Sequence, residues 1–161
     1  MANVGDSRAY RFRGGALEQI TEDHSLVESL VRQGRITAEE AANHPQRNII
    51  TRALGVDPQV EVDSWELAAV PGNRFLLCSD GLFNEVGEPQ IAEILRTVDD
   101  PTAAAEQLVA MANDGGGRDN ISVWWSTWST TRAAGPPPTR PWAASPWRST
   151  ATRPSPTAST R

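Results

Sequence analysis

The amino-acid composition changes abruptly near residue 123, and this change limits where the chain can build a packed core. Residues 124–161 contain no Leu, Ile or Val, and they hold five of the six tryptophans and seven of the twelve prolines. A segment of this composition cannot bury enough apolar surface to offset the entropy of ordering it, so we expect it to be disordered. The fold must therefore come from residues 1–123, a length that suffices for one domain with one moderate core.

The break also interrupts a strand pattern. Residues 120–123 have the composition of an opening β-strand, but residues 124–131 are a run of Trp, Ser and Thr. With the codons of a GC-rich gene, the neighbouring reading frame encodes Val-Val-Val-Asp-Val-Val-Asp-Asp there, an apolar β-branched strand with an acidic exit. Our hypothesis is that residues 124–161 are an out-of-frame translation, from which no function should be inferred. A genuine Trp/Pro-rich linker is the alternative.

Charge and cysteine content argue against several classes of function. Residues 1–123 hold all twenty acidic residues against ten arginines, a formal net charge of −10, which disfavours nucleic acid or an anionic membrane as a partner. No apolar run approaches the roughly 20 residues of a membrane-spanning helix, and the N-terminal residues lack the pattern of a signal peptide. The single cysteine, Cys78, excludes an intramolecular disulfide, and we therefore expect a cytoplasmic location.

Hydrophobic periodicity predicts a mixed order of helices and strands. Residues 9–13 and 17–20 alternate around Gly14-Gly15, as in a β-hairpin. We predict helices over residues 25–33, 37–43, 89–98 and 103–112, and strands over residues 48–54, 60–67 and 74–79. This order fits a layered α+β domain better than a strict repeat of βαβ units.

Three aspartates lie beside glycine at the ends of predicted strands. Asp6 ends a short apolar stretch, Asp80 follows the strand over residues 74–79, and Asp119 precedes the last strand. A carboxylate at such a point is held rigidly, and the adjacent glycine lets water or phosphate approach. Mg²⁺ and similar hard cations prefer oxygen ligands, and two metals about 4 Å apart can bind a phosphate and activate water. Taken singly, Asp6 and Asp80 are better explained as ordinary turn residues, and for Asp119 the two interpretations are balanced.

Taken in order, five motifs resemble the metal-dependent type 2C, or PPM-type, serine/threonine protein phosphatases, most of all bacterial members that oppose Ser/Thr kinases. The motifs lie at residues 2–10, at 21–27, at 44–48 leading to 51–55, at 77–82 and at 116–123. The match spans essentially all of residues 1–123 and corresponds to the C-terminal portion of the catalytic domain. The resemblance implies a four-layer α-β-β-α sandwich, present here without its N-terminal strands and helices.

The resemblance also implies a set of site residues. Asp80 and Asp119 match carboxylates of a binuclear Mn²⁺ or Mg²⁺ site, and Asp6 matches a ligand of a third, weaker metal that it shares with Asp80. Gly81 and Asn120 belong to the loops that support these carboxylates. Residues from about 24 to 48 match a mobile flap beside the cleft, which influences substrate choice. No residue is assigned a catalytic role beyond metal binding.

The implied reaction is attack of metal-bound hydroxide on phosphoserine or phosphothreonine in proteins, without a phosphoenzyme. Its partners are phosphorylated proteins and, with them, Ser/Thr kinases and their substrates. Because the N-terminal half of the family's domain is absent, we expect negligible phosphatase activity from this chain alone. A non-catalytic fragment or binding module of the same fold is one alternative, and an unrelated α+β domain with chance motifs is another.

Four further polar residues have plainer interpretations. We expect His24 and His44 to make local hydrogen bonds within the flap rather than to act as ligands or acids. Cys78 lies in a strand predicted to be buried, so an inert core thiol is expected. Arg118 has two open interpretations, a phosphate contact and a salt bridge within its loop.

Overall fold

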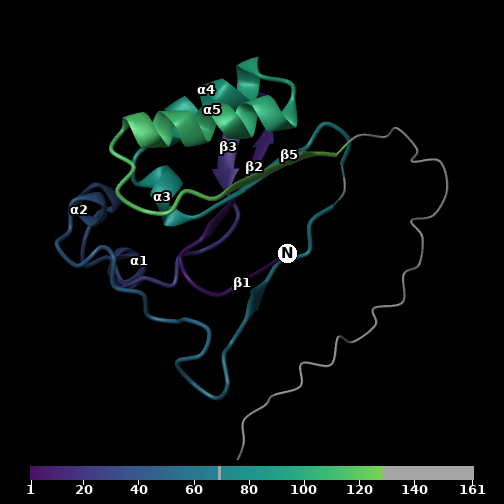
Figure 1. Ribbon diagram of the computed structural model, residues 1–161. Coiled ribbons are helices and arrows are strands. Elements are labelled where there is room, and N and C mark those ends of the chain that lie inside the picture. The colour runs from purple at the N-terminus through teal and green to yellow at the C-terminus, as the bar shows by residue number, and fades with distance from the viewer. Residues whose placement is uncertain (69, 129–161) are drawn as a thin grey trace, which may run out of the picture. The chain divides into compact units, whose positions relative to one another are not determined.

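A four-stranded antiparallel sheet lies at the centre of this computed structural model, which describes residues 1–68 and 70–128 (Figure 1). The strand order is β3 (Ala16–Gln19), β2 (Arg8–Arg13), β5 (Arg74–Cys78) and β6 (Val123–Thr127). Gly14 and Gly15 both adopt positive φ angles, 58° and 85°, which let β2 turn tightly into β3. The predicted hairpin and the predicted strand over residues 74–79 are thereby confirmed.

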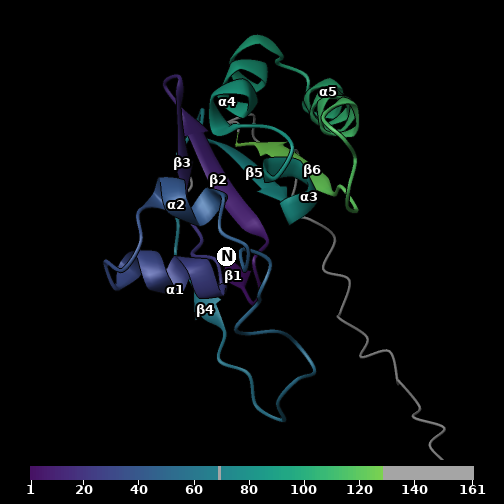
Figure 2. The same cartoon turned by 90° about the vertical axis from the view of Figure 1, so that its left-hand side faces the viewer.

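Two helices, α4 (Glu88–Thr97) and α5 (Pro101–Asp114), cover one face of this sheet (Figures 1 and 2). Both were predicted from their apolar spacing, and both have a proline in the first turn, where its missing N–H costs nothing. The core lies between the helices and the sheet and is built from fully buried side chains such as Tyr10, Leu76, Ile91, Leu95 and Leu108. Each such aliphatic side chain contributes about 1.5–3 kcal/mol through removal from water.

Helices α1 (Leu26–Arg32) and α2 (Ala38–Ala42) occupy the predicted flap and lie apart from α4 and α5 in both views (Figures 1 and 2). The Ser25 hydroxyl accepts a hydrogen bond from the Glu28 amide and caps α1, while Gly34 follows α1 with a φ of 66°. Thr37 and Glu40 form the predicted capping box of α2. Neither helix has a buried residue, so their positions depend on their ends.

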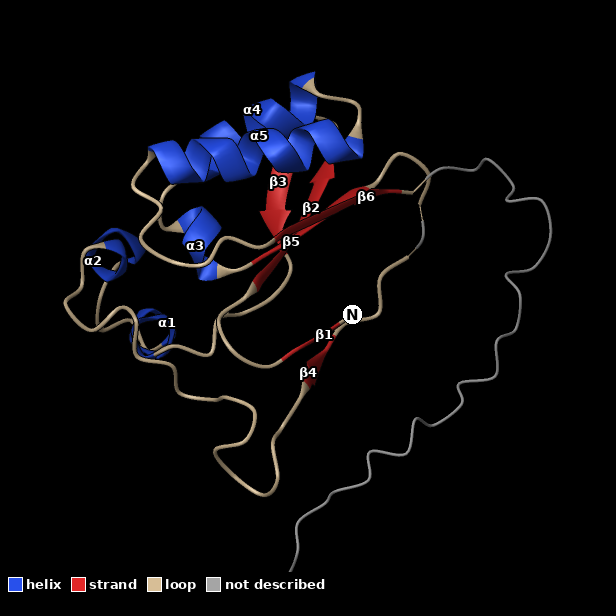
Figure 3. Cartoon of the chain, in the orientation of Figure 1, coloured by secondary structure: helices blue, strands red, loops and turns tan. Residues whose placement is uncertain are grey.

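Two predicted strands are wrong in extent. Residues 48–54 contribute only an isolated bridge between Ser25 and Ile50, and of residues 60–67 only β4 (Asp63–Ser64) is a strand. β4 pairs with β1 (Ala2–Asn3), and this two-stranded sheet is separate from the larger one (Figure 3). Apolar side chains of this region, such as Ile50 at 46% and Leu54 at 73%, remain exposed. A β-branched pattern forms a strand only where a neighbouring strand pairs with it, and the described residues supply only the short β1 and the single bridge at Ser25 here.

The last strand extends beyond the composition break. β6 runs from Val123, paired with Cys78, to Thr127, paired with Arg74, so the domain boundary expected after residue 123 falls on the first residue of a strand. Trp125 is 6% exposed, and its indole N–H has no hydrogen-bond partner among the described residues. An unpaired buried donor costs about 1–3 kcal/mol, a cost that the valine of the neighbouring frame would not incur. Residues 129–161, for which disorder was expected, lie outside the described part.

The helices found in residues 1–68 and 70–128 include none with the length and apolar character needed to cross a membrane.

Candidate metal centre

Asp80 and Asp119 come from two strands that are neighbours in the sheet. β5 ends at Cys78, and Asp80 begins the short helix α3 (Asp80–Phe83), which the sequence did not predict. Because β6 is antiparallel to β5 and pairs Val123 with Cys78, the loop that carries Asp119 returns to the same end of the sheet. The structure therefore places both aspartates in connections at one sheet end, as the motifs implied.

Direct contacts hold these two connections together. The Ser79 hydroxyl donates to the backbone oxygen of Asn120 and accepts from the amide of Ser122, each at 2.9 Å. A Cβ atom added at Gly81 would lie 2.5 Å from the Asn120 oxygen, so the approach requires glycine. Gly81 and Asn120, predicted as supporting residues, form this contact through their backbones.

Asp6 lies in a third loop, which His24 holds in place. The Gly5 amide donates to His24 Nδ1 at 3.0 Å, and the His24 amide donates to the Gly5 oxygen at the same distance. Partial burial and the negative charge of Asp80 together raise the pKa of the Asp6 carboxyl above its ordinary value. Asp6 and Asp80 line one cavity of about 610 Å³, whose wall also includes flap residues of α1 and α2.

Asp119 does not line this cavity. Its Oδ1 atom accepts a hydrogen bond from the Asn120 amide at 2.7 Å, and the residue is exposed. Within residues 1–68 and 70–128, no group of three or more His, Cys, Asp or Glu side chains is arranged to hold a metal ion. The carboxylates have the donor chemistry that Mn²⁺ or Mg²⁺ requires, but two or three of them do not complete the ligand set of a binuclear centre.

One functional feature of the cavity was missed by sequence reasoning, the ion pair of Arg8 with Asp23. The guanidinium donates from Nη2 to Asp23 Oδ2 at 2.7 Å and from Nε to both carboxylate oxygens, and it lies 3.7 Å from the centre of the Phe83 ring. The Asp23 side chain is only 8% exposed. Both residues line the cavity, so the pair fixes the root of the flap beside Asp6 and Asp80. Both lie in the motifs, but no spacing rule indicated that they pair.

Of the four residues with plainer interpretations, His44 and Cys78 lie as expected. His44 accepts a local hydrogen bond from the Gln46 amide. His24 is also structural, but its partners lie outside the flap: it accepts from the Gly5 amide, and its Nε2 atom lies 2.9 Å from the Asp63 carboxylate. Cys78 is buried, and burial raises the pKa of its thiol to about 12. Arg118 forms a salt bridge with Glu85, a residue outside its own loop.

No family model matches the chain, but individual proteins do. The chain is 48% identical over 123 residues to the serine/threonine phosphatase stp of Listeria monocytogenes, a match that covers 76% of this chain and 49% of that protein. A solved structure, the PPM Ser-Thr phosphatase MsPP of Mycobacterium smegmatis in complex with cacodylate, superposes with a TM-score of 0.71 at 47% identity. That superposition covers 77% of this chain and 53% of MsPP.

The chain belongs to the bacterial PPM family of serine/threonine phosphatases. It spans about half the length of the relatives named above, so it corresponds to part of their catalytic domain. A further structure, the catalytic domain of the phosphatase PstP in complex with two manganese ions, superposes with a TM-score of 0.66 at 39% identity; the match covers 78% of this chain and 51% of that catalytic-domain chain. The family assignment made from the motifs is confirmed, as is the mixed α+β class.

Proposed function

We propose that this chain supplies part of the active site of a metal-dependent phosphatase that removes phosphate from phosphoserine and phosphothreonine in proteins. The observation that carries the proposal is the meeting of the Asp80 and Asp119 connections at one sheet end, held by the contact between Gly81 and Asn120. Asp80 and Asp119 are the proposed ligands of a binuclear Mn²⁺ or Mg²⁺ site, and Asp6 the proposed ligand of a third, weaker metal.

In this proposal the chain supplies carboxylate ligands and also holds them in place. Asp80 is the first residue of α3, and α3 continues into the core through the buried Leu82. Asp6 lies close enough to Asp80 for the two charges to repel, and a divalent cation between them would relieve that repulsion. The remaining ligands would come from the half of the catalytic domain that the relatives have in addition. We therefore propose that the 161-residue chain is inactive alone.

A fusion protein tests this proposal. The part of the Listeria monocytogenes phosphatase that the chain does not match is joined to the N-terminus of the full chain, and phosphate release from a phosphothreonine peptide is measured in Mn²⁺. We expect turnover that Asp80→Asn or Asp119→Asn lowers at least about 100-fold, since each substitution removes a metal ligand. Asp99→Asn is the matched control, because Asp99 is 93% exposed and pairs with Arg74 away from the site.

A second candidate is a binding module that keeps the flap but performs no hydrolysis. The cavity of about 610 Å³ favours it, because residues of this chain form that cavity by themselves. The two candidates differ in the fusion protein. A fusion that binds a phosphothreonine peptide and releases no phosphate supports the binding module and contradicts the phosphatase.

A further inference from the structure

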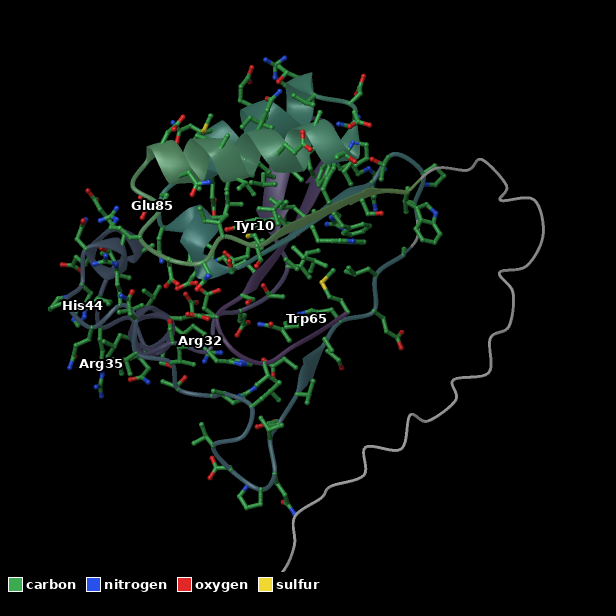
Figure 4. The ribbon with its side chains drawn as sticks, viewed as in Figure 1. Tyr10, Arg32, Arg35, His44, Trp65 and Glu85 are labelled. Atoms are coloured by element: carbon green, nitrogen blue, oxygen red, sulfur yellow. The ribbon has the colours of Figure 1, made fainter. Side chains whose placement is uncertain are left out.

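Glu85 and Arg118 form a two-point ion pair that connects α3 to the loop before β6. Arg118 donates from Nε to Glu85 Oε1 at 2.8 Å and from Nη2 to Glu85 Oε2 at 2.9 Å. The hydrogen bonds from Arg118 lower the pKa of the Glu85 carboxyl. The Glu85 side chain is only 3% exposed, whereas that of Arg118 is 69% exposed. Glu85 follows α3 in the chain and lies against the glycine turn that leads out of α5 (Figure 4).

The loop that Glu85 contacts has little stiffness of its own. Residues 115–117 are all glycine, and Gly116 and Gly117 adopt φ angles of 144° and 55°. Backbone hydrogen bonds join the three amides to the end of α5, but glycine restricts the backbone least of all residues, so contacts from outside the turn stabilise its conformation further. Glu85 supplies them, because Cβ atoms added at Gly115 and Gly116 would lie 3.2 Å from the Glu85 backbone oxygen and 3.1 Å from its Oε2 atom.

Asp119 lies between two points of attachment to the same short helix. On its C-terminal side, the Asn120 and Ser122 backbones contact Ser79 and Gly81 at the start of α3. On its N-terminal side, Arg118 is held by Glu85, which follows the end of α3. Both attachments come from residues 79–85. Leu82, within this segment, and Val86, directly after it, are 0% and 1% exposed, so the segment is anchored in the core.

We infer that Glu85 is a positioning residue, which through Arg118 fixes the glycine turn and so sets the place of Asp119 relative to Asp80. The inference rests on the proposed function only in treating these two aspartates as metal ligands. An ordinary surface pair lacks this geometry. Glu93 and Arg96 also form a two-point pair, but both are more than half exposed and lie one turn apart on α4, where they join no separate segments.

The test compares the full 161-residue chain with three variants of it. Glu85→Gln removes the charge and leaves one acceptor, and Arg118→Lys keeps the charge but loses the fork of two donors. Glu93→Gln is the matched control. Hydrogen exchange is followed by NMR at the Gly116 and Gly117 amides, which donate to Asn113 and Ala112. The Leu76 amide, in the central strand, reports whether the fold remains intact.

We expect exchange at Gly116 and Gly117 to become about tenfold faster in Glu85→Gln and in Arg118→Lys, with Leu76 unchanged and Glu93→Gln without effect. In the fusion protein, Glu85→Gln should raise the Mn²⁺ concentration for half-maximal activity several-fold and leave the peptide KM unchanged. Unaltered exchange at both glycines in both variants would overturn the inference, as would an equal change in Glu93→Gln. A fusion protein with no activity contradicts the proposed function instead, and the exchange rates still decide whether Glu85 holds the loop.

Discussion

Gly81 approaches Asn120 so closely that a side chain at position 81 has no room, since its Cβ atom would lie 2.5 Å from the Asn120 oxygen. We predict that Gly81→Ala lowers the free energy of unfolding by about 1–3 kcal/mol, the usual cost of forcing atoms into a packed site. Urea denaturation measures it. Gly87→Ala is the control, because its nearest neighbours lie 3.6 Å away, and it should cost less than about 1 kcal/mol. Equal losses in the two variants would contradict the close contact.

Asp23→Asn is predicted to destabilise the fold because it leaves the Arg8 guanidinium with only the exposed Glu88 carboxylate, 4.0 Å away. Arg8 is 22% exposed and Asp23 8% exposed, so the remaining charge would be only partly solvated. We expect a loss of about 3 kcal/mol in the free energy of unfolding, measured in urea. Glu18→Gln, which breaks the exposed pair with Arg11, should cost less than about 1 kcal/mol. A loss for Asp23→Asn no larger than this control would show that the pair does not stabilise the flap root.

Asp6 is predicted to make the metal-free chain less stable at neutral pH than it is in acid. Its pKa is raised by burial and by Asp80, so the folded state favours the protonated carboxyl. That contribution to stability is fully present below the ordinary value of 3.8 and is lost as the pH rises through the raised pKa.

Asp6→Asn removes the repulsion, so at pH 7 it should melt at a higher temperature than the unsubstituted chain in buffer with EDTA. The difference between the two melting temperatures should shrink as the pH falls toward 4. A difference that is constant with pH would contradict the assigned charge repulsion.

Cys78 is predicted to be unreactive in the folded chain. Its thiol is 4% exposed, and burial raises its pKa to about 12, so very little thiolate is available at pH 8. A thiol reagent such as DTNB should label less than about a tenth of the chain in an hour without denaturant, and all of it in urea. Rapid labelling without denaturant would contradict the burial of β5.

Local signals explain which parts of the fold could be predicted. Gly14-Gly15 sets the first hairpin, Thr37 and Glu40 cap α2, and the apolar spacing of residues 89–98 and 103–112 gives α4 and α5; none of these signals needs a distant partner. The strands expected over residues 48–54 and 60–67 do need one, and the described residues provide only β1. Helix α3 has four residues, too few for a 3.6-residue period to show.

The residues of the candidate site also differ in whether the sequence alone could indicate them. Asp6, Asp80 and Asp119 could be selected because each lies near the end of a predicted strand with glycine next to it or, for Asp119, two positions before it. The pairs Arg8–Asp23 and Glu85–Arg118 could not, because their members are 15 and 33 positions apart in the sequence and only the fold brings them together. The motifs also could not predict that Asp119 lies outside the cavity that Asp6 and Asp80 share. The position of Asp119 depends on the conformation of one glycine-rich loop.

The most direct test of the proposal that this chain holds only part of a phosphatase site is phosphate release from a phosphothreonine peptide by the purified 161-residue chain in millimolar Mn²⁺. We predict no release above that of the Asp80→Asn variant, together with clear release by the fusion protein under the same conditions. Robust Mn²⁺-dependent turnover by the chain alone, abolished by Asp80→Asn, would contradict the proposal and show that its own carboxylates suffice.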